Sequence, residues 1–584
     1  MHSKNATSKS KANNVVGIGF NMRVAVWALL IVFGWRALAL MAQSLNRPAI
    51  VSGLASVRQY AQDIVPNHAN TCMVFCQETE EGVGIYYFDM ALAAPRLLCE
   101  LKEAAHRWQR FTMFDWTLDD KFFACAYPDA RQNAEFILIF DGVTGILLDK
   151  VKVDDNLYQF GWLSDDRFAY STRTTIQVVN RTPNGGWTYE RSFENVAKAM
   201  DNFVPISSSA VAWRDENGIW LLDINSASPQ RIWEATTNGL VEFTYSSSAN
   251  RLSLNCNDDR GQYLLVADPG ANQIWNAGRL GNQQDYIRNV VWSERGSGYA
   301  YLTNDLAGAA ICAKTEEMDS PVTIPWHGGI RTITLNGDRI YFSGNAEDKP
   351  PGIWECDIRS GNFHSLLGAE RHALRYTINS PSSSHVLTNS LGEERFYHIW
   401  LPPAASHIRK FPLLLGQELN TWFPWFQMAA HSGYCVAIVD RPFCHTWNGK
   451  HEHTWMEDVH SLYETMASNP DIDTNQVFLY GCSAETSYLS RFMEEYPNIA
   501  KGAVLFSPTI LPDVRSLKNK HMLLVDGMAD GDAPLRLAKY QDSAMLTGNK
   551  VAVYLEKGAG HNTASGSSER NRAMQVAAFL SEER

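Results

Sequence analysis

The stretch VFLYGCSAE, from Val477 to Glu485, decides how the C-terminal part of this chain folds. Its first four residues are an apolar run that predicts a buried strand, and the run ends at Gly481. A helical pattern follows, because apolar side chains recur at positions i, i+3, i+4 and i+7: Leu489, Phe492, Met493 and Tyr496. A strand, a sharp turn that carries Ser483 and a helix together predict a nucleophile elbow.

An elbow would equip Ser483 for covalent chemistry. The turn lifts the hydroxyl away from the sheet, the helix N-terminus favours negative charge, and the backbone N–H of Ala484 points to where an oxyanion would form. The usual motif is G-x-S-x-G, and Glu485 stands at its last glycine. G-x-S alone is a weak signal, since many strand-to-helix turns contain a small residue, so the rest of the chain decides its meaning.

The composition is that of a globular protein. The 584 residues are 45% hydrophobic and 20% charged, and the length allows two or more domains. The net charge of −12 argues against a nucleic-acid partner. The ten cysteines include no C-x-x-C pair and show no metal-ligand spacing, so we expect no metal and no cofactor. Nothing in the composition specifies an oligomeric state.

The N-terminus carries a targeting segment. Residues 24–42 are apolar apart from Arg36, and their length is just enough to span a bilayer. Residues 1–23 are basic and contain no acid, which predicts a cytoplasmic tail. One interpretation is an uncleaved signal anchor followed by a linker over residues 43–64. The alternative is a signal peptide that is cleaved at Ala37-Leu38-Ala39. In both cases the body is exported, either anchored to the membrane or secreted.

A short strand pattern that ends in Asp or Asn recurs between residues 65 and 375. Its clear copies span residues 85–89, 137–141, 176–180, 219–223, 264–268 and 353–357. Ala310 to Ala313 falls in the one double-length interval, which makes seven units of roughly 45 residues, the blade period of a β-propeller. A second repeat, an aromatic strand before a polar turn, begins at Phe114 and Phe160, with Phe243 and Val290 at equivalent places. We assign the recurring Trp and Asp residues structural roles.

From residue 376 to 584 strand-like runs alternate with helical runs, which predicts a parallel sheet covered on both faces. The expected strands span residues 411–415, 434–439, 477–480, 503–506, 522–525 and 551–555. Between the second and third strands, a helix has Val459, Leu462, Tyr463 and Met466 on one face. Functional sites in such sheets lie at the carboxyl ends of the strands.

Three of these strand ends are followed by Ser, Asp and His, which is the chain order of α/β-hydrolases. The residues are Ser483, Asp530 and His561. His561 would accept the proton of the serine and return it to the leaving group, and Asp530 would fix the tautomer of the histidine. Asp526 and Asp532 are nearby alternatives for the carboxylate.

A seven-bladed β-propeller followed by an α/β-hydrolase domain resembles the prolyl oligopeptidase family of serine peptidases, over most of the chain from about residue 50. The likeness is carried by Gly481-Cys482-Ser483, by DGMAD at residues 526–530, which is similar to the family's H-G-x-x-D, and by Gly560-His561. Asp440-Arg441 and Glu457-Asp458-Val459 also fall where the family has similar residues. The resemblance implies that the propeller covers the active site and limits substrates to short peptides. Membrane-bound members also have an N-terminal signal anchor.

The sequence departs from the family at places that bear on catalysis. Asp526 replaces the His of H-G-x-x-D. The glycine-rich segment after the first hydrolase strand reads LGQE at residues 415–418, so a backbone N–H near Gln417 would supply the second oxyanion donor. Glu485 would bring a negative charge near the oxyanion, which an active enzyme must turn away, pair with a cation or keep protonated. Arg441 is the partner that we expect.

The sequence therefore supports three functions of different classes. The first is a membrane-anchored serine peptidase that hydrolyses short peptides. The second is an esterase or acyl hydrolase that uses the same triad on a small ester. The third is a decayed hydrolase whose propeller binds a partner. Glu485 and the altered segment 415–418 favour the third function, and the order Ser, Asp, His favours the first two.

We expect the body of the protein on the extracytoplasmic side of the membrane. Protease treatment of intact cells should degrade it, because the basic tail keeps residues 1–23 inside and residues 24–42 span the bilayer. Full protection of the body contradicts this topology. Release of a soluble protein that begins near Leu40 indicates cleavage in place of anchoring.

Overall fold

The computed structural model describes most of the chain beyond residue 61. The described ranges are residues 62–78, 83–92, 94–101, 114–129, 134–153, 157–194, 196, 201–215, 218–226, 228–234, 239–246, 251–258, 261–268, 273–279, 286–293, 298–305, 308–315, 317–326, 328–346, 349–368, 380, 382–402, 410–418, 424–440, 452–528, 530–557 and 566–583. The expected tail (residues 1–23) and anchor (residues 24–42) lie outside them. None of the helices in these ranges has both the length and the apolar character needed to cross a bilayer.

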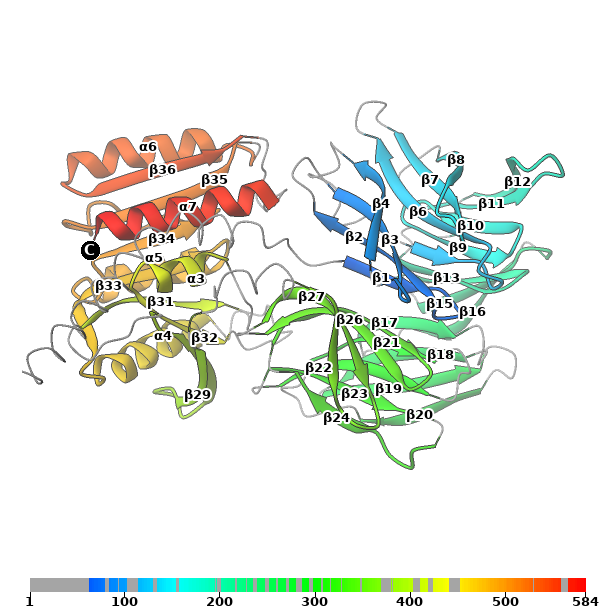
Figure 1. Ribbon diagram of the computed structural model, residues 1–584, viewed down its shortest axis with the longest axis horizontal. Helices are drawn as coiled ribbons and strands as arrows, with labels where there is room; N and C mark the ends of the chain where they lie inside the picture. The colour runs from blue at the N-terminus through cyan, green and yellow to red at the C-terminus, as the bar shows by residue number, and fades with distance from the viewer. Residues whose placement is uncertain are drawn as a thin grey trace, which may run out of the picture. The chain divides into compact units, whose positions relative to one another are not determined.

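Seven four-stranded antiparallel sheets, each built from four consecutive strands, form the first part of the described chain (Figure 1). The first four sheets contain β1 (Gln62–Pro66), β2 (Cys72–Glu78), β3 (Val83–Asp89), β4 (Ala94–Leu101); β5 (Phe114–Trp116), β6 (Phe122–Asp129), β7 (Ala134–Asp141), β8 (Leu147–Val153); β9 (Gln159–Ser164), β10 (Arg167–Ser171), β11 (Ile176–Arg181), β12 (Trp187–Phe193); β13 (Asp201–Ser207), β14 (Ala210–Asp215), β15 (Gly218–Asp223) and β16 (Pro229–Glu234). The last three contain β17 (Gly239–Ser246), β18 (Arg251–Asp258), β19 (Gly261–Asp268), β20 (Gln273–Arg279); β21 (Tyr286–Trp292), β22 (Tyr299–Asp305), β23 (Gly308–Lys314), β24 (Val322–Pro325); β25 (Ile330–Asn336), β26 (Arg339–Ala346), β27 (Lys349–Asp357) and β28 (Phe363–Gly368). The predicted seven-bladed β-propeller is confirmed.

Each sequence repeat marks one strand of the blade. The pattern that ends in Asp or Asn is the third strand, so that Ile85–Asp89 lies in β3 and Ala310–Ala313 lies in β23. The aromatic repeat is the first strand, as Phe114–Trp116 is β5. The terminal Asp has a structural role, because Asp141 accepts a hydrogen bond from the Thr144 backbone N–H at 2.7 Å and so holds the turn to the fourth strand.

The propeller closes by side-chain packing between its first and last blades. The first strands of neighbouring blades contact one another around the ring, and β1 contacts both β5 and β25. The first and last blades do not share a sheet. Phe75 and Phe88 of the first blade are buried in one cluster with Tyr341 and Ile353 of the last. The Asn70 side-chain amide also donates a hydrogen bond to the Tyr341 hydroxyl at 2.8 Å across this seam.

An eight-stranded sheet forms the C-terminal part of the chain (Figure 1). Its strands are β29 (Ser382–Thr388), β30 (Glu394–Trp400), β31 (Phe411–Glu418), β32 (Cys435–Asp440), β33 (Ile472–Cys482), β34 (Gly502–Phe506), β35 (His521–Gly527) and β36 (Lys550–Glu556). They lie in the order β29-β30-β32-β31-β33-β34-β35-β36. The strands expected from the sequence correspond to β31 through β36, and neighbours among them are parallel.

The first two strands of this sheet correct the expectation of a purely parallel sheet. β29 and β30 form an antiparallel hairpin, and β30 runs antiparallel to β32. An antiparallel connection needs no crossover helix. The other strands were predicted because strands and helices alternate along the chain. This hairpin contains no helix, so the same pattern could not indicate it.

Helices cover both faces of the sheet. They are α3 (Pro424–His431), α4 (Glu452–Ala467), α5 (Glu485–Glu495), α6 (Ala533–Leu546) and α7 (Gly566–Glu582). Alternate residues of a strand point to opposite faces. Phe478 of β33 packs against Phe579 of α7, with ring centroids 5.8 Å apart. The next residue, Leu479, is buried in one cluster with Val459 of α4 and Leu489 of α5.

A buried ion pair fastens the β29–β30 hairpin to α4. Arg395 of β30 donates through Nε to Asp458 Oδ2 of α4 at 3.1 Å, and Asn389 Nδ2 donates to Asp458 Oδ1 at 2.8 Å. The Asp458 side chain has no exposed surface and that of Arg395 is 7% exposed. Burial raises the pKa of Asp458, and the charge of Arg395 opposes this effect.

We expect Arg395→Ala to lower the free energy of unfolding by about 3–5 kcal/mol, because Asp458 would stay buried without its cation. Urea unfolding followed by intrinsic fluorescence measures this. Arg515→Ala is the control, since Arg515 pairs with Asp513 at the surface and its side chain is 83% exposed. Its effect should stay within about 0.5 kcal/mol. Equal effects of the two substitutions would show that the pair does not hold the hairpin.

Candidate active site

Ser483 lies in a strained turn at the carboxyl end of β33. The strand ends at Cys482 and α5 begins at Glu485, so only two residues separate them. Ser483 has a φ of 51°, in the left-handed region that residues other than glycine rarely adopt. Its side chain is half-buried. Strain of this kind persists only where the surroundings impose it, and it occurs often at functional sites.

Hydrogen bonds hold this turn from two neighbouring segments. The Ser483 backbone N–H donates to the carbonyl of Phe506, the last residue of β34, at 2.9 Å. The Ser483 carbonyl accepts from the backbone N–H of Thr486 at 3.1 Å and from the Thr509 hydroxyl at 3.1 Å. The backbone of the serine is thus tied to the next strand, to the loop after it and to α5.

Steric contact explains why the first glycine of the motif is present and the last is not. A Cβ at Gly481 would lie 2.2 Å from Cδ1 of Leu489, so a side chain there would push α5 away from β33. Position 485 has room for a side chain, because Glu485 is accommodated with 6% of its surface exposed. In this chain α5 therefore lies closest to β33 at the first glycine of the motif and leaves room for a side chain at the last.

Acidic side chains surround the residues next to the serine. Burial is the main cause that raises the pKa of the Cys482 thiol, and the carboxylates of Glu418 and Glu485 raise it further. The Tyr480 hydroxyl donates a hydrogen bond to Glu418 Oε2 at 3.3 Å. Arg572 lowers the pKa of the same thiol. Negative charge at this strand end is therefore offset in part by a cation from α7.

Arg572 is the residue that the sequence analysis missed. Its side chain is buried, and Nε donates to Glu556 Oε2 at the end of β36, at 3.2 Å. No local motif marks it, because an arginine in a C-terminal helix usually lies at the surface. Arg441, the expected partner of Glu485, lies outside the described residues.

The two expected oxyanion donors occupy different environments. Ala484 is the N-terminal cap of α5, so its own N–H precedes the helix and has no partner within it. Gln417 is in β31 and pairs with Val439 of β32. Its side chain is 1% exposed, and Oε1 has no hydrogen-bond partner among the residues that the structure describes. The residues that follow Glu418 directly lie outside the described ranges.

The candidate carboxylates differ in burial. Asp526, in β35, has no exposed surface, and its Oδ1 accepts a hydrogen bond from the Gly527 N–H at 2.8 Å. Burial raises the pKa of Asp526 to about 6, and the charge of Asp530 raises it as well. Asp530 is half-buried in the turn before α6, where its carbonyl accepts from the Ala533 N–H at 2.9 Å. Asp532 is exposed.

The strand order determines which of these groups can meet. β33, β34, β35 and β36 are parallel neighbours, so their carboxyl ends lie along one edge of the sheet. Ser483, Asp526 and Asp530 are at this edge, and Gly527 pairs with Glu556 of β36. His561 lies outside the described residues. In the described part of the chain, no group of three or more His, Cys, Asp or Glu side chains is arranged to hold a metal ion.

The raised pKa of Asp526 makes stability depend on pH. The folded-state value of about 6 exceeds the usual value of about 3.9, so the folded protein binds this proton more tightly than the unfolded chain. Relative to Asp526→Asn, wild-type stability should be highest below pH 4 and fall by up to about 3 kcal/mol as pH rises through 6. Urea titrations from pH 4 to 8 test this. Met528→Asn, at an exposed neighbour without an ionisable group, should show a constant difference from wild type. A constant difference for Asp526→Asn as well would contradict the assignment.

Comparison of the sequence with known proteins identifies no family, whereas comparison of the structure identifies a fold. No family model matches the sequence. A diaminopimelate epimerase of Burkholderia pseudomallei (strain 668) is 28% identical over 156 residues, which cover 25% of this chain and 53% of that protein. The chain thus spans about half the length of this relative, and the match assigns no activity to this chain.

Solved peptidase structures are similar over nearly the whole chain. A structure from an analysis of two prolyl endopeptidases has a TM-score of 0.65 at 11% identity and covers 93% of this chain and 94% of that one. An acylaminoacyl peptidase in complex with Z-Gly-Gly-Phe-chloromethyl ketone has a TM-score of 0.67 at 11% identity, with 90% and 96% covered. A puromycin-hydrolyzing peptidase of Mycobacterium tuberculosis has a TM-score of 0.67 at 11% identity, with 91% and 95% covered. The chain therefore has the fold of prolyl oligopeptidase-type peptidases.

Proposed function

We propose that this chain is an exported serine peptidase of the prolyl oligopeptidase type that hydrolyses short peptides. Residues 24–42 would hold it at the membrane, with the catalytic body outside. The observation that carries the proposal is the backbone of Ser483. A serine with a φ of 51° between a buried strand and a helix, in the fold of known peptidases, is what a nucleophile elbow requires.

The proposed reaction proceeds through an acyl-enzyme. Ser483 Oγ attacks the peptide carbonyl carbon while His561 takes the hydroxyl proton, and Asp530 stabilises the resulting imidazolium. The Ala484 N–H donates to the oxyanion of the tetrahedral intermediate. His561 then passes the proton to the departing amine. A water molecule hydrolyses the acyl-enzyme by the same steps and regenerates Ser483.

The environment of Ser483 bears on the charge problem that Glu485 poses. A carboxylate in the first turn of α5 is favoured by the helix N-terminus, but it opposes a nearby oxyanion. Glu485 is buried, and its charge acts on Cys482, where the charge of Arg572 opposes it. In our proposal Arg572 limits the field of Glu485 at the oxyanion, whether or not Arg441 also pairs with it.

Two other functions remain distinguishable from this one. An esterase or acyl hydrolase would use the same Ser483 chemistry on a small ester. A decayed hydrolase with the propeller as a binding module is favoured by the buried Glu485 at the position of the last motif glycine. Both are separated from a peptidase by what the protein turns over.

We expect a fluorophosphonate probe to label the wild type at Ser483. Ser483→Ala should abolish labelling and lower peptide hydrolysis on the order of 10⁴-fold or more, because the covalent intermediate cannot form. Cys482→Ala is the matched control, since it changes the adjacent side chain and leaves the hydroxyl in place. It should retain labelling. Gel fluorescence and peptide turnover are the measurements, with circular dichroism to verify folding.

The outcomes separate the three functions. Labelling with turnover of peptides supports the peptidase. Labelling with turnover of esters alone supports an acyl hydrolase. A folded wild type that neither labels nor turns over either substrate contradicts the catalytic proposal, and labelling that persists in Ser483→Ala places the nucleophile elsewhere.

A further inference from the structure

The propeller contains two adjoining cavities of about 550 Å³ and about 580 Å³. These volumes lie within the range of about 300–1,000 Å³ that is usual for small-molecule sites. Both cavities are lined by His68, Asp115, Trp116, Leu118 and Tyr245. Between them, every blade contributes residues from its first strand or from the turn directly after it. The cavities therefore lie along the central channel, at the end where the first strands stop.

Asp115 is a carboxylate built into the wall of both cavities. Its Oδ2 accepts the backbone N–H of Trp162 in the next blade at 2.8 Å, and its Oδ1 accepts the N–H of Trp116 at 3.1 Å. A Cβ at Gly161 would lie 3.3 Å from Oδ2 and closer still to Pro205, so the absence of a side chain at Gly161 leaves room for this approach. The carboxylate is thus fixed between two blades.

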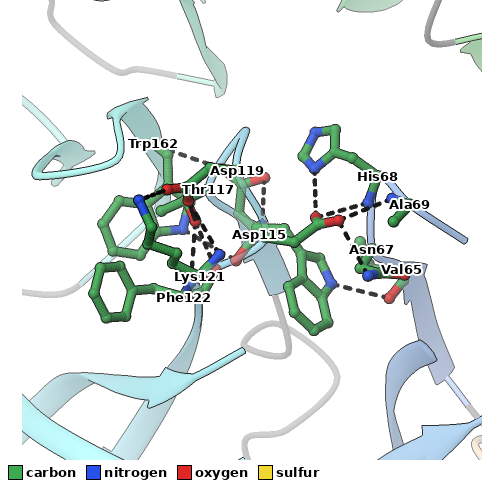
Figure 2. Close-up of polar contacts among 12 residues, drawn as sticks. Val65, Asn67, His68, Ala69, Asp115, Thr117, Asp119, Lys121, Phe122 and Trp162 are labelled. Carbon is green, nitrogen blue, oxygen red and sulfur yellow. Dashed lines mark hydrogen bonds and ion pairs between the residues drawn. The ribbon is translucent and has the colours of Figure 1, made fainter. Parts of the chain in front are cut away.

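His68 is the second ionisable group that lines both cavities, and it is held in one orientation. Its Nδ1 bonds Asp120 Oδ1 at 3.0 Å, and its backbone N–H donates to the same oxygen at 2.8 Å. Asp120 also accepts from the Ala69 N–H and the Asn67 side chain. With Nδ1 as the donor, Nε2 carries a lone pair, and the hydrogen bonds of His68 within the described residues do not involve Nε2. Figure 2 shows the His68 ring with one nitrogen facing the carboxylate that binds it.

The lining favours a cation. It includes no Lys or Arg among the described residues, whereas it contains the Asp115 carboxylate and the aromatic side chains of Trp116, Trp162, Tyr245 and Trp292. Carboxylates and aromatic faces both attract ammonium groups, and the attraction grows where water is excluded. An anion would meet the Asp115 carboxylate with no Lys or Arg in the described lining to compensate for its charge.

We propose that these cavities form a binding site for a primary ammonium group, held by the Asp115 carboxylate with Nε2 of His68 as a hydrogen-bond acceptor. The group could belong to the N-terminus of a short peptide or to a small organic amine. Both have the same chemistry, and the site is independent of whether Ser483 is catalytic. A peptide would reach beyond its ammonium group along the aromatic lining.

The charge state of Asp115 predicts how binding depends on pH. Burial raises the pKa of Asp115 to about 6, and the backbone hydrogen bond from Trp162 and, to a smaller extent, the charge of His68 oppose that effect. Only the carboxylate form attracts an ammonium ion, so affinity should be full above pH 7 and fall about tenfold at pH 5.

The test measures binding to the full chain by titration calorimetry in the Ser483→Ala background, which prevents turnover. The probes are Ala-Ala-Phe amide, its N-acetylated form and propylammonium. Leu118→Lys places a competing cation in the lining at a position that is already 63% exposed. Leu92→Lys is the matched control, because Leu92 is 74% exposed in the first blade and does not line either cavity.

We expect the free amine peptide to bind at least tenfold more tightly than its acetylated form at pH 7.5. Leu118→Lys should abolish this preference and Leu92→Lys should keep it. If propylammonium competes with the peptide, a small amine is sufficient for binding. If it does not compete, the ligand is a peptide. Both results support the site. Equal binding of the two peptides, no binding of either, or a preference that survives Leu118→Lys would overturn the proposal.

Discussion

The close approach of α5 to β33 at Gly481 is the constraint on which the candidate active site depends. Leu489 packs where a side chain at position 481 would lie, so the next-to-last residue of β33 must be a glycine. Ser483 takes up that turn in a left-handed conformation, and hydrogen bonds from Thr486 and Thr509 and to Phe506 hold it. The packing of one leucine thus brings the helix close to the strand, and these hydrogen bonds hold the backbone of the proposed nucleophile.

Charge at the same strand ends is arranged around that turn. Three acidic groups act on Cys482, the residue before the serine: Glu418, Glu485 and Asp526. The positive charge of Arg572 acts on the same residue in the opposite direction. Such acidic groups raise the energy of any further negative charge nearby. The proposed oxyanion therefore depends on donors such as the Ala484 N–H and on the opposing field of Arg572.

The propeller uses the same residue types for two purposes. Aromatic side chains fill the space between blades, as Trp162 does between Phe122 and Phe168. Trp162 also lines a cavity and donates its N–H to Asp115. Acidic residues cap turns within a blade, but Asp120 reaches the first blade and Asp115 reaches the third. A structural role for these residues therefore does not exclude a binding role at the channel.

The sequence by itself determined the elements and their order. A blade period, an aromatic first strand and a third strand that ends in Asp are local patterns, so seven blades and β31 through β36 could be predicted from them. The turn at Ser483 was also predictable, because strand, glycine and helix are consecutive there.

Only the tertiary structure decided which side chains meet. Arg572 reaches the surroundings of Cys482 from α7, Arg395 meets Asp458 across 63 residues, and His68 meets Asp120 across 52. The antiparallel β29–β30 hairpin likewise lacked the helix that marks a crossover. The hydrophobic periodicity of a segment shows which of its own side chains are buried. These pairs depend on how distant segments are brought together, and no local pattern contains that information.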